Sequence, residues 1–224
     1  MSVDDLAYLP AVEQLARFRA GELSPVEVLD AQIERAERFE PVVNAFSATL
    51  FEQARTRAQQ AEQRYREGRP RRLEGLTLAV KETMAVRGTV TTHGSLVHRD
   101  DPPAVRSHPY VERLQRAGAI VHARTTSPEF ACAWITTSRL NGTTRSPWDR
   151  ELTCGASSGG SGASLAVGST TLATGTDIGG SIRYPAAACG VVGYMPPHGR
   201  NPEVSPDNLD PYEHVGPLAR TVAD

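Results

Sequence analysis

A tract of eight small residues, Gly155-Ala-Ser-Ser-Gly-Gly-Ser-Gly162, constrains this chain more than any other segment. Residues with so little side chain let backbone approach backbone, or approach a ligand, and glycine permits dihedral angles that larger residues refuse. A second serine framed by glycines follows 24 residues after Ser157, in the stretch Gly175-Thr-Asp-Ile-Gly-Gly-Ser181-Ile-Arg-Tyr-Pro. Both segments therefore place a serine where the backbone can come close to a ligand.

Lys81 is the only lysine of the chain, because 23 of the 24 basic residues are arginine. It follows the apolar run Leu76-Thr-Leu-Ala-Val80, which is typical of a buried strand. Arginine keeps its proton at any working pH, whereas a buried lysine can lose its proton and act as a base. One such lysine and two serines framed by glycines together indicate an active site.

Length and composition place the chain among ordinary globular proteins. Its 224 residues suffice for one sizeable domain or two small ones, and 39% are hydrophobic and 22% charged. A net charge of -2 gives no reason to expect nucleic acid. No run approaches the ~18 apolar residues of a membrane span, and the first residues lack the features of a signal peptide. The three cysteines have an odd count and no metal-binding spacing. We therefore expect a cytoplasmic protein without metal, cofactor or membrane contact.

Residues 1–72 are predicted to be an N-terminal helical segment. Ser24-Pro-Val-Glu27 is a capping box, followed by apolar residues at helical spacing, and residues 50–66 favour a surface helix. From Leu73 onward, short apolar runs alternate with helical patterns, which predicts an α/β core with a mixed or parallel sheet over residues 73–224. Strands are expected at 76–80, 119–123, 171–174 and 191–194, and helices at 109–117 and 161–167. Thr221 resembles the cap of a further helix, so we expect the core to be incomplete at its carboxyl end.

Other glycine-rich sites fit the chain poorly. Neither tract holds the lysine of a P-loop, and Gly160-Ser-Gly162 lacks the third small residue of a dinucleotide fingerprint. Gly155-Ala-Ser157-Ser-Gly159 matches the nucleophile elbow of an esterase, with His198 and His214 downstream as candidate bases. That elbow requires a buried strand immediately before it, and the preceding residues are polar and turn-like.

A serine–serine–lysine assembly satisfies the chemistry better. Hydrolysis of an amide needs an activated nucleophile, a proton carrier and donors for the oxyanion. A buried, neutral lysine paired with a serine supplies the first two, and burial lowers a lysine pKa by as much as ~3–5 units. The second serine can relay the proton. Consecutive backbone amides at Ile178-Gly-Gly-Ser181 can converge on one oxygen.

Five motifs in order resemble the amidase signature family, over about residues 73–224 and more loosely before them. They are the serine–glycine tract, the stretch Gly175–Pro185, and the segments Ala79-Val-Lys-Glu82, Thr125-Thr-Ser-Pro-Glu-Phe130 and Gly142-Thr-Thr-Arg-Ser-Pro-Trp-Asp149. The resemblance implies that Ser181 is the acyl-forming nucleophile, Ser157 the bridging serine after a cis peptide bond, and Lys81 the base. It also implies an α/β amidase-signature fold with a mixed sheet flanked by helices.

The same resemblance assigns the supporting residues. The oxyanion hole falls on Ile178, Gly179 and Gly180 together with the nucleophile, and Asp177 and Arg183 would fix the loop. Ala156 departs from the family, which usually has glycine before the bridging serine. Met195 replaces a lysine that the family often carries. Family members are also roughly twice as long, which again suggests an N-terminal half.

The sequence thus predicts an amidase that hydrolyses carboxylic amides to acid and ammonia or amine through an acyl-enzyme. Its partner would be a small-molecule amide substrate, without direct contact to nucleic acid, and we keep a homodimer as an expectation. Two alternatives stay open. One is the glutamine-hydrolysing amidase subunit of a tRNA-dependent amidotransferase, a choice that residues 136–138 do not settle. The other is a truncated, inactive amidase fragment.

Overall fold

A computed structural model describes residues 2–224 and has four helices in its amino-terminal part. These are α1 (Val3–Tyr8), α2 (Ala11–Ala20), α3 (Pro25–Val43) and α4 (Phe51–Arg66). The predicted capping box begins α3, since Ser24 Oγ accepts a 3.1 Å hydrogen bond from the Val26 amide and the Ser24 amide donates to Glu27 Oε2 at 2.8 Å. Helix α4 buries only a stripe of alanines, as expected for a surface helix.

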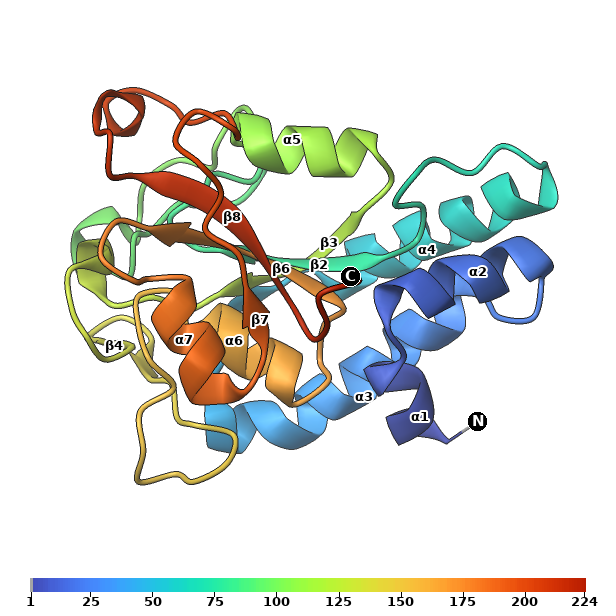
Figure 1. The fold of residues 1–224 in the computed structure, drawn as a ribbon, viewed down its shortest axis with the longest axis horizontal. Coiled ribbons are helices and arrows are strands. Elements are labelled where there is room, and N and C mark those ends of the chain that lie inside the picture. Colours follow the sequence, from blue (N-terminus) through green and yellow to red (C-terminus); the bar gives the residue numbers. More distant parts are fainter. Residues whose placement is uncertain (1) are drawn as a thin grey trace.

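Six strands form one mixed sheet in the order β1-β3-β2-β6-β8-β7 (Figure 1). The central strands β3, β2 and β6 run parallel, and β1, β8 and β7 join antiparallel to their neighbours. A separate two-stranded ladder joins β4 to β5. The strands are β1 (Phe46–Thr49), β2 (Thr77–Lys81), β3 (Ile120–Thr125), β4 (Thr137–Ser138), β5 (Gly142–Thr143), β6 (Leu172–Asp177), β7 (Val192–Gly193) and β8 (His214–Ala219).

The remaining helices cover the sheet. They are α5 (Pro109–Arg116), α6 (Gly159–Ala166) and α7 (Arg183–Cys189), with short 3-10 turns at Leu96–His98, Glu129–Ala131 and Asp207–Leu209. Figure 1 shows α5 on one side of the sheet and α6 with α7 on the other. No helix of the described residues is long and apolar enough to cross a membrane.

Alternation along β2 decides where Lys81 points. All five residues of this strand are buried. Leu78 and Val80 belong to the core cluster that also contains α5 residues, whereas Ala79 packs in the cluster that contains α6 residues. Successive side chains of a strand point to opposite faces. Lys81 therefore lies on the same face as Ala79, toward α6 and the glycine tract.

Two strands were not predicted. Strand β1 lies inside the segment expected to be helical and pairs Phe46 with Thr125 of β3, so residues 1–72 contribute to the sheet. Strand β8 occupies residues where we expected the approach to a helix, because Leu218 is fully buried and pairs with Ala173 of β6. After β8, residues 220–224 contain no helix. The boundary at residue 72 remains a prediction.

Candidate active site

The glycine tract becomes the start of a buried helix. A Cβ built at Gly160 would lie 2.5 Å from the Thr126 amide nitrogen, and one at Gly155 would lie 2.8 Å from Pro185 Cα. Real Cβ atoms essentially never approach so closely. Backbone therefore packs directly on backbone, as the sequence predicted, and this packing carries Ser157 into the interior.

Lys81 and Ser157 meet inside the protein. Lys81 Nζ donates a 2.7 Å hydrogen bond to Ser157 Oγ, and the side chains come from β2 and from the segment that leads into α6. Lys81 is 0% exposed and Ser157 is 1% exposed. The Ala156–Ser157 peptide bond is cis, as the resemblance implied. The structure thus brings together two of the three predicted catalytic residues in direct contact.

Burial prepares the lysine to act as a base. Removing the ammonium from water lowers the pKa of Lys81 from 10.5 to about 8, although the charges of Glu213, Glu82 and Asp177 partly oppose that change. No carboxylate forms an ion pair with Lys81 among the described residues. A substantial fraction of the lysine is therefore neutral near physiological pH.

Ser181 lies in the loop between β6 and α7, beside the serine tract. Its carbonyl oxygen accepts a 3.1 Å hydrogen bond from the Ser158 amide, which fixes the two segments together. Ser181 is partly exposed, and its hydroxyl makes no hydrogen bond with the described residues. That hydroxyl is accordingly available to a substrate from the solvent side.

Asp177 holds the Ser181 loop in shape. Its carboxylate accepts hydrogen bonds from the amides of Gly180 (2.6 Å) and Ile182 (3.1 Å) and from the Arg183 guanidinium (2.9 Å). Burial alone would raise the pKa of Asp177, but the guanidinium and amides outweigh it and lower the pKa to about 2. Asp177 and Arg183 thus form the contact that the resemblance assigned to them.

The backbone donors of this loop are not equally available. The Gly180 amide already donates to Asp177, whereas the amides of Ile178, Gly179 and Ser181 make no hydrogen bond with the described residues. Ile178 is 56% exposed, so the loop faces solvent. Of the four predicted oxyanion donors, three can therefore point to a substrate oxygen without losing an existing partner.

Sequence reasoning missed two groups that act on Lys81. Thr176 Oγ1 accepts a second hydrogen bond from Lys81 Nζ at 2.9 Å, which fixes the amine on β6. Glu213 precedes β8, whose register pairs His214 with Asp177, so its carboxylate lies near the Ser181 loop. Burial raises the pKa of Glu213 to about 7, with Lys81 opposing. Thr176 stands inside a motif that was noticed, but Glu213 has no local signal.

The histidine-based elbow is not supported. Ser157 is bound to Lys81, while His198 Nδ1 lies 3.4 Å from the Glu213 carbonyl and His214 Nδ1 lies 2.7 Å from the Tyr212 carbonyl. No strand immediately precedes the serine tract, only one isolated bridge at Thr153. The elbow geometry is therefore absent around Ser157 in the described part of the chain. Nor do residues 2–224 contain a group of three His, Cys, Asp or Glu side chains that could hold a metal ion.

Known proteins share this arrangement. The model of the family described as Amidase matches residues 27–224. A putative amidase, AmiB2, from Mycobacterium tuberculosis is 36% identical over 231 residues, covering 100% of this chain and 48% of the relative. The amidase-type polypeptide of the glutamyl-tRNA(Gln) amidotransferase from Carboxydothermus hydrogenoformans is 38% identical over 229 residues, covering 98% of this chain and 46% of the relative.

A solved structure agrees with these relatives. The crystal structure of a bacterial aryl acylamidase, assigned to the amidase signature enzymes, superposes with a TM-score of 0.91 at 31% identity. The match covers 96% of this chain and 46% of that one. The chain therefore spans about half the length of the relatives it matches.

Proposed function

Because this chain belongs to the amidase signature family, we propose that it carries the catalytic residues of a hydrolase that cleaves carboxylic amides to acid and ammonia or amine. The observation that carries this proposal is the 2.7 Å contact between the buried amine of Lys81 and the hydroxyl of Ser157. A lysine that is neutral near pH 8 can take a proton, which an exposed lysine does not do at that pH.

The proposed reaction has two steps. Neutral Lys81 takes the proton of Ser157 while Ser157 takes that of Ser181, whose oxygen attacks the amide carbon. The developing oxyanion accepts hydrogen bonds from the free amides of the Ser181 loop. The proton returns along the same path to the leaving nitrogen, and an acyl-enzyme on Ser181 remains. Water then repeats the sequence and releases the acid.

A covalent probe tests this assignment. A fluorophosphonate should label the chain on Ser181, and Ser181→Ala should abolish the labelling. His198→Ala and His214→Ala are the controls, and both should be labelled like the wild type. Peptide mapping that finds the label on Ser157 in Ser181→Ala would favour the esterase-type elbow and contradict the proposal.

The glutamine-hydrolysing component of an amidotransferase is a second candidate. Its support is the similarity to the Carboxydothermus polypeptide over nearly the whole chain. Such a component would hydrolyse glutamine through the same Lys81, Ser157 and Ser181. Residues 136–138 do not distinguish the two candidates, because the buried Thr136 Oγ1 donates to the Gly155 carbonyl at 2.8 Å and so has a structural role.

Substrate competition distinguishes the two candidates. Saturating L-glutamine should slow labelling of Ser181 if the site is built for glutamine, whereas an aromatic or aliphatic amide should slow it if the site is an amidase. D-glutamine is the control for non-specific effects. Protection by L-glutamine alone would favour the amidotransferase candidate. A chain that neither amide protects and that no probe labels would correspond to the inactive fragment.

A further inference from the structure

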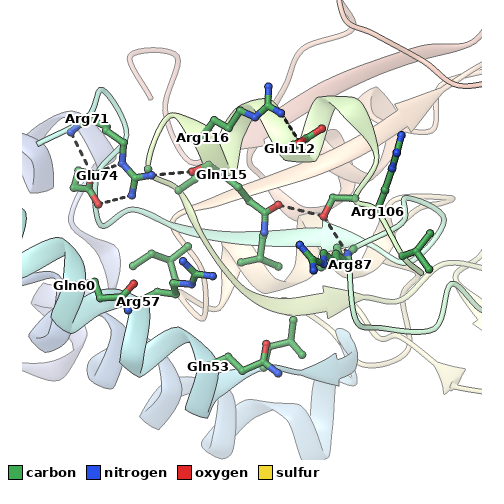
Figure 2. Close-up of a pocket in the computed structure, with 18 residues that line it drawn as sticks. Gln53, Arg57, Gln60, Arg71, Glu74, Arg87, Arg106, Glu112, Gln115 and Arg116 are labelled. Carbon is green, nitrogen blue, oxygen red and sulfur yellow. Dashed lines mark hydrogen bonds and ion pairs between the residues drawn. The ribbon is translucent and has the colours of Figure 1, made fainter. Parts of the chain in front are cut away.

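A large cavity of the protein lies away from the candidate active site. It has a volume of about 910 Å³ and lies between α4 and α5, beside the first residues of β3 (Figure 2). Neither Lys81, Ser157 nor Ser181 lines it. Its size is within the range of about 300–1,000 Å³ that small-molecule sites occupy. The cavity therefore needs an explanation separate from amide hydrolysis.

Positive charge dominates the lining of this cavity. Five arginines and two glutamates line it: Arg57, Arg71, Arg87, Arg106, Arg116, Glu74 and Glu112. Arg71 pairs with Glu74 at 2.6 Å, and Arg116 pairs with Glu112 at 2.6 Å. The other three have no carboxylate partner in the described part of the chain. The lining thus carries five positive and two negative charges, an excess of three, although the whole chain has a net charge of -2.

The three unpaired arginines come from three different segments, as Figure 2 shows. Arg57 lies on α4, Arg87 follows β2, and Arg106 precedes α5. A hydrogen-bonded chain joins the last two segments, since Ser107 Oγ accepts from the Arg87 amide at 3.0 Å and donates to Gln115 Oε1 at 3.2 Å. The backbone that carries Arg87 and Arg106 is therefore held in place before any ligand arrives.

The floor of the cavity is apolar. Val86 and Ile120 line it and are 4% and 3% exposed, and Leu50 and Val121 lie beside them. Guanidinium groups form bidentate hydrogen bonds with phosphate and carboxylate, and they also stack on flat ring systems. An apolar floor below three unpaired guanidinium groups suits a ligand with both an anionic and a ring or hydrocarbon part.

We propose that this groove binds an organic polyanion of nucleotide size. Its phosphate or carboxylate groups contact Arg57, Arg87 and Arg106, and its ring or hydrocarbon part lies on Val86 and Ile120. A single inorganic phosphate is too small to span arginines from three segments in a cavity of this volume. The site is independent of the proposed hydrolysis, because no residue of the candidate active site lines it.

Titration calorimetry with the 224-residue chain tests the proposal, using ATP, inorganic triphosphate and citrate at low salt. The test variant is Arg57→Gln/Arg87→Gln/Arg106→Gln. Its matched control, Arg139→Gln/Arg150→Gln/Arg200→Gln, removes the same charge from three exposed arginines that do not line the cavity. Circular dichroism confirms that both are folded. Single Arg57→Gln and Arg106→Gln variants replace the triple variant if it does not fold.

The wild type should bind ATP saturably with one site. The groove variant should lose roughly tenfold or more in affinity, because charge-assisted hydrogen bonds are about twice as strong as neutral ones. The control variant should stay within about twofold, and affinity should fall as salt shortens the Debye length from about 30 to about 8 Å.

The ligands separate the two sources of charge. Equal affinity for ATP and triphosphate would assign binding to phosphate alone, and tighter citrate binding would assign it to polycarboxylates; both leave the anion site in place. Three results overturn the proposal: no saturable binding of any of the three anions, equal losses in the groove and control variants, or binding to RNA or acidic polypeptide without binding to a small anion.

Discussion

Lys81 is the residue whose chemistry can be tested most directly. Lys81→Arg keeps the positive charge but removes a base that titrates near neutrality, because arginine stays protonated. We expect the rate at which a fluorophosphonate labels Ser181 to fall by ~10²–10⁴-fold, as for loss of a general base. Arg139→Lys, an exchange of the same two residue types on the surface, should leave the rate unchanged. Near-normal labelling in Lys81→Arg would contradict the mechanism.

The pH dependence of labelling follows from the same amine. Only neutral Lys81 accepts a proton, so the labelling rate should be low under acidic conditions and rise with a midpoint near the pKa of about 8. The carboxylate of Glu213 raises that pKa by favouring the ammonium. Glu213→Gln should therefore lower the pKa of Lys81 and move the ascending limb to lower pH.

The pH profiles of wild type, Glu213→Gln and Glu151→Gln give the check. Glu151 is exposed and does not contribute to the pKa of Lys81, so its variant should follow the wild type. Glu213 has a pKa of about 7 and is mostly ionised on the limb near pH 8, so its loss is felt there. A limb that stays in place or moves to higher pH would rule out this electrostatic role.

Most of the candidate site could be predicted at the residue scale, and what was missed has a physical reason. Lys81, Ser157 and the Asp177–Arg183 pair stand in motifs whose local composition is distinctive. Glu213 is distant in sequence from all of them and comes near only through the antiparallel register of β6 and β8. No local pattern encodes that register, so a charge that acts through space on Lys81 remained hidden.

At the scale of elements, the start of α6 makes a prediction about packing. Alanine is favoured over glycine by ~1 kcal/mol in a helix interior. At Gly160, however, a Cβ would lie 2.5 Å from the Thr126 amide nitrogen, and crowding of this kind costs ~1–3 kcal/mol. Backbone atoms of a central strand end cannot move aside easily. We expect Gly160→Ala to lower the free energy of unfolding, as measured by urea denaturation.

Gly179→Ala is the control for this stability measurement. A Cβ at Gly179 would have no heavy atom within 4 Å, and its φ is not in the left-handed region. Its free energy of unfolding should therefore stay close to that of the wild type. A Gly160→Ala variant as stable as Gly179→Ala would mean that the glycine tract is not required for packing.

The elements that were predicted carry their signals locally, and those that were missed do not. Helix α3 has a capping box, and β2 is a short apolar run beside a turn. Strand β1 is only four residues long with a single buried position, and it is a strand because β3 lies beside it. Strand β8 contains Gly216 and Pro217, which disfavour strands, yet it pairs along its whole length with β6. Tertiary pairing outweighed local propensity in both.

At the scale of the whole molecule, the candidate site is supported unevenly. Lys81 and Ser157 are fully enclosed, but Ile178 in the loop of Ser181 is 56% exposed, and the nearby Trp134, whose ring centroid lies 6.5 Å from that of Tyr184, is 68% exposed. Exclusion of water strengthens the electrostatic interactions on which an oxyanion hole depends. The deprotonation machinery is therefore enclosed in the described residues, while the substrate side of the nucleophile is open to solvent.

This asymmetry predicts that covalent labelling and turnover will differ. Labelling of Ser181 needs mainly Lys81 and Ser157, whereas turnover of an amide also needs the substrate held in register, and a misplacement of about 1 Å costs ~10²-fold. The 224-residue chain should therefore be labelled, yet hydrolyse simple amides at least ~10²-fold more slowly than a relative of twice its length. Ammonia release by monodisperse chain, with Ser181→Ala as the blank, measures this. Turnover equal to that of a full-length amidase would show that these residues position an amide substrate by themselves.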